Sequence, residues 1–383
     1  MRIGINTLFL IPSEVGGTET ILLETVKAIR GLNSSVRFTF FTNRENHPLF
    51  KELIRKIGNS DLCALDFCAS NRVLRILREQ FELPGKVGKS GVDILWSPGY
   101  TGPISVPVPH IVSIPDVQYK THPEDMTFIA RLVTHLIVQS VAKRANAILT
   151  LSGFAKSEIC KYYKLSEEKI VVAHCGVNEC FNHPNQPSCI DARLIHLINE
   201  NKPYLLCVAN SYPHKNLHTL VRAFKDLEDR IPHSLVLIGR KRLGEVKIEK
   251  AIQALKNPNR VLRIDYVQHQ DLPWIYQHAD VFVFPSLYEG FGLPILEAMT
   301  VGCVIIASRS ASVPEIAGDS VMYFDGKSAE ELTHLILDAS KFDPEECERR
   351  KNLVQRRSQL FSWDHTAQVT LNAFQEVMRM ASK

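Results

Sequence analysis

Short apolar runs alternate with amphipathic helical patterns along the whole chain, and the alternation occurs in two blocks. In the first block, apolar runs of strand length are separated by segments with helical spacing. Strands separated by helices predict parallel βαβ units with right-handed crossovers. The expected strands are residues 2–10, 37–42, 93–98, 110–116 and 146–152, and the expected helices are 18–32 and 128–145.

A polar, proline-bearing stretch at residues 178–192 interrupts this pattern, and the same alternation then restarts. Such a composition favours a linker between two domains. We therefore predict an α/β protein of two Rossmann-like, doubly wound domains that face a cleft. The second domain's expected strands are 204–210, 234–239, 261–267, 281–286 and 303–308, and its expected helices are 217–227, 247–255, 272–279 and 294–302.

Composition agrees with a two-domain cytoplasmic protein. The 383 residues exceed one typical domain, and 45% apolar with 22% charged residues is ordinary for a soluble chain. No apolar run reaches the roughly 18 residues that a membrane span needs, and the N-terminus lacks the features of a signal peptide. The formal charge of +4 does not require a nucleic-acid partner.

Cysteine usage also favours a reducing compartment. The nine cysteines form no CxxC pair, and an odd number of scattered cysteines is typical of free thiols. The C-x4-C spacings Cys63/Cys68 and Cys175/Cys180 have no neighbours that would complete a zinc site. We therefore expect no metal.

Positive charge is concentrated at Arg72, Arg75 and Arg78, which have helical spacing with apolar residues between them. One interpretation is a basic amphipathic helix that contacts anionic lipid or a phosphate-bearing acceptor, giving the protein a peripheral membrane contact. The other is an ordinary solvated helix face, which is the favoured one of the two.

Chemistry is expected in the loops that follow the strands, because open α/β sheets bind ligands beyond the carboxyl ends of their strands. The segment PSLYEGFGLPILEA, residues 285–298, is such a loop and carries two glutamates eight positions apart. Gly290 and Gly292 permit positive φ and a close approach of ligand to backbone. Pro294 suits the first turn of a helix. The amides of residues 290–293 are thus expected at a helix N-terminus, which favours phosphate.

Both carboxylates extend this phosphate site. Glu297, expected in the first helical turn, is suited to accept two ribose hydroxyls, and Glu289, on the preceding turn, is suited to bind hydroxyls of the group that the phosphates carry. The alternative is a helix N-terminus that carries glutamates only to complement its dipole. The two glycines and the proline favour the ligand.

These residues resemble a known signature. EGFGLPILE, residues 289–297, resembles the E-x7-E motif of retaining glycosyltransferases of family 4, which have the GT-B fold. The resemblance continues through 278–325 and includes KIVVAHCGVN (169–178), similar to the family's interdomain crossing, and FSWDHTA (361–367), similar to its returning C-terminal helix. It implies an acceptor-binding domain, a linker, a nucleotide-sugar-binding domain and a helix that packs back on the first domain, at residues 1–178, 179–200, 201–361 and 362–383.

Carried over to this chain, the resemblance assigns Glu289 to the donor sugar and Glu297 to the nucleotide ribose. Lys215, in YPHKNL, matches the family's phosphate-binding lysine, which neutralises the leaving diphosphate. Since no DxD motif offers a metal for that role, no metal or other cofactor is expected. The amides expected to hold the sugar and diphosphate belong to Gly290, Phe291, Gly292 and Leu293.

One arginine of the family pattern, upstream of the lysine, is absent. Asn210 lies in that region and offers a hydrogen bond, while Arg240 is a candidate for the second positive charge. Tyr266 and Val267, at the end of an expected strand, are expected near the nucleobase.

In the first domain, Gly16 and Gly17 resemble the glycine-rich loop that approaches the diphosphate from the other side of the cleft. The alternative is an ordinary glycine turn before a helix. IVSIPDVQYKTHPED resembles the family's strand ending in His-Asp, but Pro115 replaces the histidine and removes one contact to the donor sugar. The resemblance counts Asp116 with Glu289 and Lys215 as catalytic. The acceptor-binding candidates are Asp116, Tyr119 and His122, and for His122 a structural role is an equal alternative.

The resemblance implies transfer of a hexosyl group from a nucleotide diphosphate sugar to a hydroxyl of a sugar or lipid-linked acceptor, with retention of configuration. YPHKNL and FSWDHTA favour mannose and GDP, with UDP-sugars as the next choice. A degenerate protein that binds nucleotide sugar without turnover and a phosphorylase of the same fold are alternatives. An oxidoreductase is disfavoured because no predicted strand is followed by GxGxxG.

Overall fold

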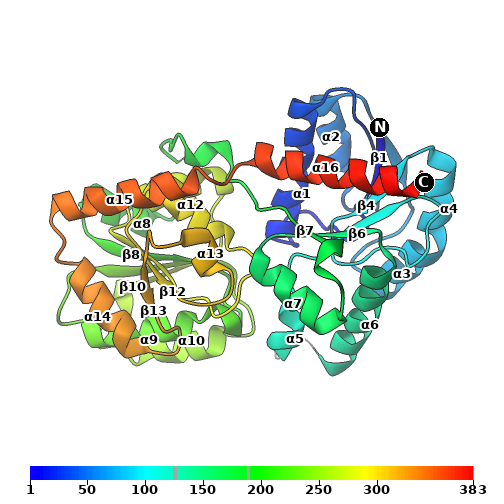
Figure 1. The fold of residues 1–383 in the computed structure, drawn as a ribbon. Coiled ribbons are helices and arrows are strands. Elements are labelled where there is room, and N and C mark those ends of the chain that lie inside the picture. The colour runs from blue at the N-terminus through cyan, green and yellow to red at the C-terminus, as the bar shows by residue number, and fades with distance from the viewer. Residues whose placement is uncertain (124–126, 188–189, 383) are drawn as a thin grey trace. The chain divides into compact units, whose positions relative to one another are not determined.

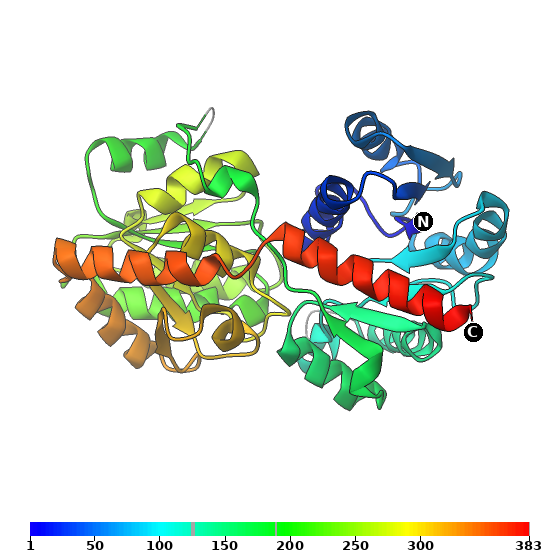
Figure 2. The ribbon, with the colours of Figure 1, turned by 45° about the horizontal axis from the view of Figure 1, so that its top comes forward.

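A computed structural model describes residues 1–123, 127–187 and 190–382, which fold into two compact units. Unit 1 takes the described residues of 1–121, 126–176 and 362–383, so both ends of the chain belong to it. Unit 2 takes those of 122–125 and 177–361. Figures 1 and 2 show the course of the chain through the two units.

Unit 1 contains a seven-stranded sheet with the order β3-β2-β1-β4-β5-β6-β7, and every neighbouring pair is parallel. The order runs outward in both directions from β1, which is the doubly wound arrangement. The strands are β1 (Arg2–Asn6), β2 (Arg37–Thr42), β3 (Ser60–Ala64), β4 (Ile94–Ser97), β5 (His110–Ser113), β6 (Ala147–Thr150) and β7 (Ile170–Val172). Its helices are α1 (Gly17–Leu32), α2 (His47–Ile57), α3 (Arg72–Leu77), α4 (Leu83–Ser90), α5 (Gln118–Thr121), α6 (Phe128–Arg144), α7 (Gly153–Tyr163) and α16 (Trp363–Ala381).

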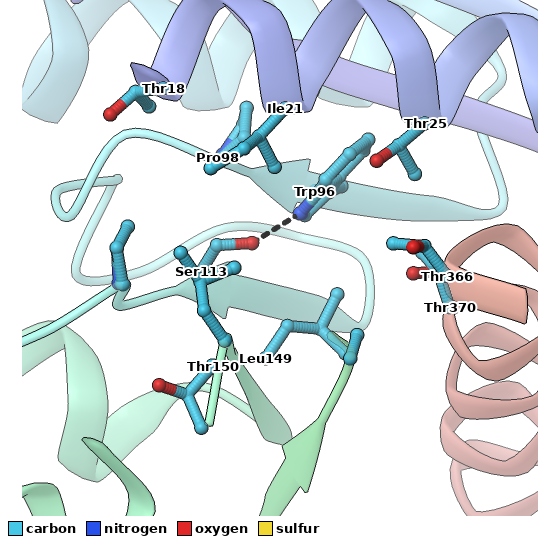
Figure 3. A pocket seen from close by; sticks show the side chains of 13 residues that line it. Thr18, Ile21, Thr25, Trp96, Pro98, Ser113, Leu149, Thr150, Thr366 and Thr370 are labelled. Atoms are coloured by element: carbon cyan, nitrogen blue, oxygen red, sulfur yellow. Dashed lines mark hydrogen bonds between the residues drawn. The ribbon is translucent and has the colours of Figure 1, made fainter. Parts of the chain in front are cut away.

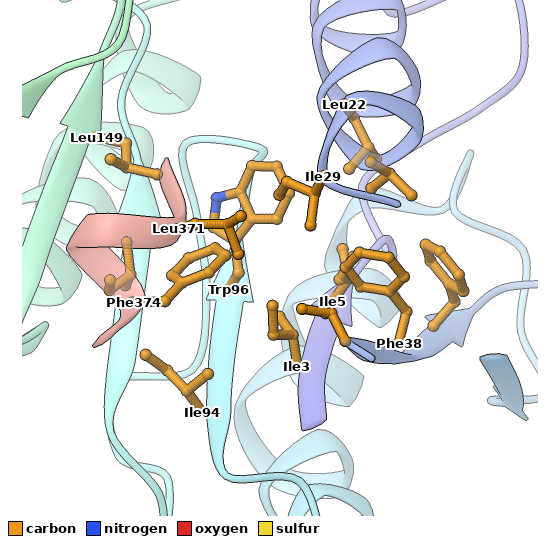
Figure 4. Close-up of a cluster of buried hydrophobic side chains, with 14 of the residues drawn as sticks. Ile3, Ile5, Leu22, Ile29, Phe38, Ile94, Trp96, Leu149, Leu371 and Phe374 are labelled. Carbon is orange, nitrogen blue, oxygen red and sulfur yellow. The ribbon is translucent and has the colours of Figure 1, made fainter. Parts of the chain in front are cut away.

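The largest core of unit 1 joins the sheet to helices from opposite ends of the sequence. Side chains of β1, β2, β4 and β6 meet those of α1 and α16 in one buried cluster (Figure 4). The rings of Trp96 and Phe374 lie 5.8 Å apart in this cluster. Each such buried apolar side chain contributes about 1.5–3 kcal/mol. Helix α16 is therefore an integral part of unit 1.

Unit 2 contains a six-stranded parallel sheet with the order β10-β9-β8-β11-β12-β13. The expected fold class, two doubly wound α/β sheets, is confirmed. The strands are β8 (Tyr204–Val208), β9 (Ser234–Ile238), β10 (Val261–Ile264), β11 (Val281–Phe284), β12 (Ile305–Ser308) and β13 (Met322–Phe324). The helices are α8 (Ala192–Asn199), α9 (Leu217–Leu227), α10 (Glu245–Gln253), α11 (Leu272–Gln277), α12 (Leu293–Val301), α13 (Val313–Ala317), α14 (Ala329–Ala339) and α15 (Pro344–Ser358).

The expected strands are present, but several are shorter than the apolar runs suggested. The first ends at Asn6 instead of residue 10, because a turn closed by Leu10 N–H to the Thr7 carbonyl follows it. The edge strands β3, β7 and β13 were not predicted. Their residues are only partly buried for the most part, so the apolar signal of a central strand is absent.

The predicted linker, 179–200, is not uniformly extended. Helix α8 lies within it, and Leu194, Leu197 and Ile198 form its buried face at the i, i+3, i+4 spacing of a helix. Asp191 caps the helix by accepting a hydrogen bond from the Arg193 N–H. Residues 188–189 of this segment, including Cys189, lie outside the described residues.

The helix around Arg72–Arg78 does not expose all three of its arginines, contrary to expectation. Arg75 turns toward the fully buried Glu79, and burial lowers the pKa of its guanidinium. Apolar side chains instead face solvent, since Val73 and Phe81 are 69% and 80% exposed. The expectation of three arginines on one solvated face was therefore wrong for Arg75.

The described cysteines are free thiols, namely Cys63, Cys68, Cys160, Cys175, Cys180, Cys207, Cys303 and Cys347. Among the described residues no helix combines the length and apolar character needed to cross a membrane.

Candidate functional site

The loops that follow the central strands of unit 2 converge at one edge of the sheet. Lys215 ends the 3-10 turn η5 (Pro213–Lys215) after β8, and Glu289 lies in the loop between β11 and α12. These loops are tied together by main-chain bonds, since Leu287 N–H donates to the His214 carbonyl over 2.8 Å. Asn216 Nδ2 also donates to the Pro285 carbonyl over 3.1 Å. The backbone therefore holds Lys215 and Glu289 side by side.

Lys215 and Glu289 form a close ion pair. The Lys215 Nζ atom lies 2.8 Å from both Oε1 and Oε2 of Glu289, and the two side chains are 22% and 11% exposed. Because both side chains are largely shielded from water, the attraction between their charges is screened less than it would be at the surface. The pair joins Lys215, which the family resemblance assigns to the phosphate, and Glu289, which it assigns to the donor sugar.

The turn between Glu289 and α12 has the geometry of an anion-binding helix start. Gly292 caps the helix with a φ of 103°, a conformation that side chains rarely adopt. The hydroxyl of Ser312 lies within 2.9 Å of the carbonyls of both Glu289 and Phe291 and fixes the turn. The amides of residues 290–293 therefore lie at the positive end of α12. Of the two glycines that permit a positive φ here, Gly292 has one and Gly290 does not.

Glu297 lies one residue deeper in its helix than expected. Helix α12 begins at Leu293, which puts Glu297 in its second turn, and no acidic residue is in the first. The Glu297 carboxylate is 8% exposed and accepts hydrogen bonds from Tyr276 Oη at 3.1 Å and His269 Nε2 at 3.3 Å. It thus has two polar partners that the sequence analysis did not identify.

His269 is held in its charged form by these contacts. Burial alone would lower the pKa of this imidazole, but hydrogen bonds to Cys180 and Glu297 and the Glu297 charge raise it to about 10. The Phe181 ring lies edge-on to it, with centroids 5.2 Å apart. His269 therefore brings a positive charge to the deep carboxylate of the site.

The loops after β8, β9 and β10 hold the residues expected near the base and the second charge. Asn210 Oδ1 accepts a hydrogen bond from Arg240 N–H at 2.8 Å, so this amide ties two loops together. The Arg240 guanidinium lies over the Tyr266 ring at 5.7 Å. Tyr266 is 63% exposed and Val267 is buried, so Tyr266 is the one that presents a ring to solvent.

His122 belongs to unit 2 and packs against the residues that precede the ion pair. Its ring lies 5.6 Å from those of His214 and Tyr288, and His214 in turn stacks on Tyr212. Desolvation, with the nearby Lys215 charge, lowers the pKa of His214 to about 2, so that imidazole is neutral. His122 therefore contacts the residues that directly precede Lys215 and Glu289 in the chain.

The remaining candidates lie in unit 1. Gly16 precedes α1 with a φ of 62°, and Gly17 is the first residue of that helix. Asp116 accepts a hydrogen bond from Gln118 N–H at 3.0 Å and so shapes the turn into α5. Tyr119 is only 7% exposed, and its hydroxyl lies 2.5 Å from that of Tyr163. Because desolvation raises its pKa to about 12, Tyr119 is a neutral core residue.

Pro115 borders a small apolar cavity of about 30 Å³ in unit 1 (Figure 3). Trp96 Nε1 donates to Ser113 Oγ across it at 2.8 Å, and Thr25 Oγ1 at its wall has no partner in the described structure. The cavity is large enough for one water molecule and too small for a hexose ring. The Pro115 side chain thus forms part of the wall of this cavity and offers no hydrogen bond.

His269, Tyr276 and Ser312 are the site residues that the sequence analysis missed. His269 follows the predicted strand 261–267 by two positions, so attention to the loop after that strand would have found it. Tyr276 and Ser312 had no comparable signal, because each acts through a contact with a residue more than twenty positions away.

The chain is similar to curated proteins over about two thirds of its length. The chain is 28% identical over 256 residues to the O-antigen chain mannosyltransferase B of Escherichia coli, a match covering 66% of this chain and 65% of that protein. It is 24% identical to the O-antigen chain mannosyltransferase RfbU of Salmonella typhimurium, covering 68% of each. The chain thus matches about two thirds of the length of these relatives.

Solved structures and family models agree with this. A sucrose-phosphate synthase from Thermosynechococcus elongatus superimposes with a TM-score of 0.77 over 100% of both chains at 17% identity, which shows the fold alone, as expected for GT-B. The model of "Glycosyl transferases group 1" matches residues 191–357, and that of "Glycosyltransferase Family 4" matches residues 15–179. The two models together span both sheets, and the chain belongs to the group 1 glycosyltransferases of family 4.

Proposed function

We propose that this protein transfers a hexosyl group, mannose in the first instance, from a nucleotide diphosphate sugar to a hydroxyl acceptor with retention of configuration. In this reaction the bond between the anomeric carbon and the diphosphate breaks, and the anomeric carbon bonds to the acceptor oxygen on the same face. The leaving diphosphate takes the proton of that hydroxyl.

The observation that carries the proposal is the Lys215–Glu289 ion pair beside the N-terminus of α12. A diphosphate bound at that helix start would compete with Glu289 for the Lys215 ammonium. Glu289 is then released toward the hydroxyls of the transferred sugar, while Lys215 stabilises the negative charge that develops on the leaving group. Family membership supports these roles, and Lys215 serves where a metal would otherwise be needed.

Glu297 is proposed to bind the nucleotide ribose, with His269 and Tyr276 holding its carboxylate in place. Tyr266, exposed beside Arg240, is proposed to stack on the base. Mannose and GDP are favoured because the relatives named above are mannosyltransferases, and a UDP-sugar is the second choice.

For the acceptor we propose a sugar or lipid-linked sugar in polysaccharide biosynthesis, as the printed names of the O-antigen relatives suggest. The corresponding location is the cytoplasm, with peripheral contact at the inner face of the plasma membrane. Asp116, close to the N-terminus of α5, is the remaining candidate of unit 1 for acceptor binding.

The test has two steps. Thermal stabilisation is measured with GDP, UDP and ADP in parallel, and hydrolysis of the matching sugar nucleotides is then followed by mass spectrometry. One nucleotide should stabilise the protein, and its sugar nucleotide should be hydrolysed slowly. Absence of stabilisation by all three nucleotides would contradict the proposed donor site.

Pro115 favours one alternative, a protein that binds nucleotide sugar without turnover, since this residue cannot hydrogen-bond a sugar hydroxyl. The alternative predicts stabilisation by a nucleotide with no hydrolysis and no transfer to any acceptor. Hydrolysis by the parent chain distinguishes the two, because it is expected only of a working catalytic site. Pro115→His then tests the residue itself, and the added hydrogen bond to the sugar should raise hydrolysis by at least about tenfold.

A further inference from the structure

Helix α6 carries apolar side chains on two opposite faces, and only one of these faces is covered. Val138, Val141 and Ala142 are buried in a core cluster of unit 1. The α6 apolar face, as we name the other, exposes 41–74% of each of its side chains. It consists of Phe128, Ile129, Leu132, Val133 and Leu136.

The spacing of these five residues makes them one continuous surface. At about 100° per residue they occupy an arc of roughly 140° over the first half of the helix, and the buried residues point to the opposite side. A helix that is apolar all round is normally buried, so the exposed half calls for an occupant. Single exposed apolar residues need no explanation, but five adjoining ones do.

The charges on α6 indicate what that occupant is. Residues 128–144 contain no carboxylate, and Lys143 and Arg144 are exposed at the end of the helix. The Arg131 guanidinium lies 5.5 Å from the centre of the Phe128 ring. Burial lowers the pKa of Lys120, and the nearby charge of Arg131 lowers it further. Glu124 and Asp125 precede the helix in the sequence and lie outside the described residues.

We propose that the α6 apolar face docks on the surface of an anionic lipid bilayer. Apolar side chains enter the boundary between headgroups and acyl chains, and flanking cations meet the lipid phosphates. Because α6 contains no carboxylate, the same face of a second copy would offer these cations no opposite charge, which disfavours a second copy as the occupant. This inference rests on the proposed function. Docking on the bilayer would bring a lipid-linked acceptor to Asp116, which precedes α6 in the chain.

The test is flotation of the full chain with vesicles of phosphatidylcholine alone or with 30% phosphatidylglycerol. Binding is expected on the anionic vesicles and should weaken as sodium chloride is raised. The triple variant Ile129→Gln, Leu132→Gln, Leu136→Gln should lose at least about tenfold in partitioning, because its apolar area is removed. Lys143→Gln with Arg144→Gln should lower partitioning and reduce its salt dependence.

Leu243→Gln with Val246→Gln is the matched control, because both residues are more than 60% exposed and lie in unit 2. This variant should bind vesicles as the parent does. Equal binding by parent and triple variant, or no binding by the parent at low salt, overturns the proposal. So does a dimer in solution that the triple variant abolishes. Nucleotide-induced stabilisation, measured on the same variants, reports separately on the donor site.

Discussion

Glu289 and Glu297, eight positions apart, have different partners, so their substitution by alanine should have different effects. Glu289 pairs with Lys215, whereas Glu297 is held by His269 and Tyr276. Glu289→Ala should lower turnover by at least about 100-fold and leave nucleotide affinity equal or higher, because Lys215 loses its competitor. Glu297→Ala should weaken nucleotide binding by about 1.5–3 kcal/mol, the worth of a hydrogen bond to a charged group.

The measurement is calorimetric affinity for the nucleotide together with steady-state hydrolysis or transfer, with Glu289→Gln as the isosteric control. An equal loss of nucleotide affinity in the two alanine variants would contradict the division of roles.

The charge on His269 makes a second prediction at this scale. Its pKa rises from 6.5 to about 10 on folding, so the folded state keeps a proton that the unfolded state loses. The resulting stability is fully present below about pH 6.5 and disappears as pH rises toward 10. Because the side chain is 44% exposed, the loss should not exceed about 1 kcal/mol.

This is checked by urea unfolding at pH 6.5 and pH 10 for the parent and for His269→Gln. The parent should lose more stability than the variant over this interval. The same loss in both proteins would show that His269 is not charged through Glu297.

At the residue scale, the motifs placed Lys215 and Glu289 in loops that follow strands of unit 2, and the roles assigned to them stay predictions. Lys215 and Glu289 were assigned from separate loops, and the structure brings their charges together. Glu297 was placed in the first turn instead of the second, because the predicted helix start at residue 294 is one residue later than the observed start at Leu293. Tyr119 was read as an acceptor ligand, and nothing local in its sequence reveals that Tyr163 buries its hydroxyl.

At the scale of elements, the central strands and their helices followed from the apolar pattern, while edge strands and polar surface helices did not. The helices that were missed are α2, α4, α5, α7, α8, α13, α14 and α15. Helix α15 has few apolar residues and buries only Val354 and Ser358. Its pattern therefore carries little of the helical periodicity on which a prediction depends.

The junction of β8 and β9 with their loops allows an element-scale prediction. Gly239 has a φ of 142°, and a Cβ there would lie 2.3 Å from the Ala209 carbonyl oxygen. Gly239→Ala should therefore cost about 2–4 kcal/mol in unfolding free energy and disturb the Asn210–Arg240 contact. Gly31→Ala, in helix α1 with open space around its Cβ, should be neutral or stabilising by about 0.5–1 kcal/mol.

Chemical denaturation of both variants measures this difference. If Gly239→Ala proves as stable as the parent, the close approach of the two loops is not a constraint on the fold.

At the scale of the whole molecule, unit 1 is assembled from both ends of the chain. Phe374 on α16 packs on Trp96 of β4, inside the same cluster as α1. Phe374→Ala should cost about 3–5 kcal/mol of the stability of unit 1 through the cavity that it leaves. Nucleotide binding by unit 2 should persist, because no residue of α16 belongs to that unit.

Urea unfolding followed by tryptophan fluorescence in a Trp274→Phe background reports on unit 1 through Trp96 and Trp363, and thermal stabilisation by the nucleotide reports on unit 2. Leu360→Ala, at a residue that is 63% exposed, is the control and should change little. A loss below about 1 kcal/mol in Phe374→Ala would mean that α16 is not part of the unit 1 core.

The return of α16 to unit 1 also bears on how the protein is made. Every residue of unit 2 between 177 and 361 leaves the ribosome before α16 does, so unit 2 can complete its fold while unit 1 still lacks a wall of its core. The order in which the two units mature is then the reverse of the order in which they begin. Until α16 has been synthesised, the side of Trp96 that Phe374 will cover stays open to solvent and to chaperones.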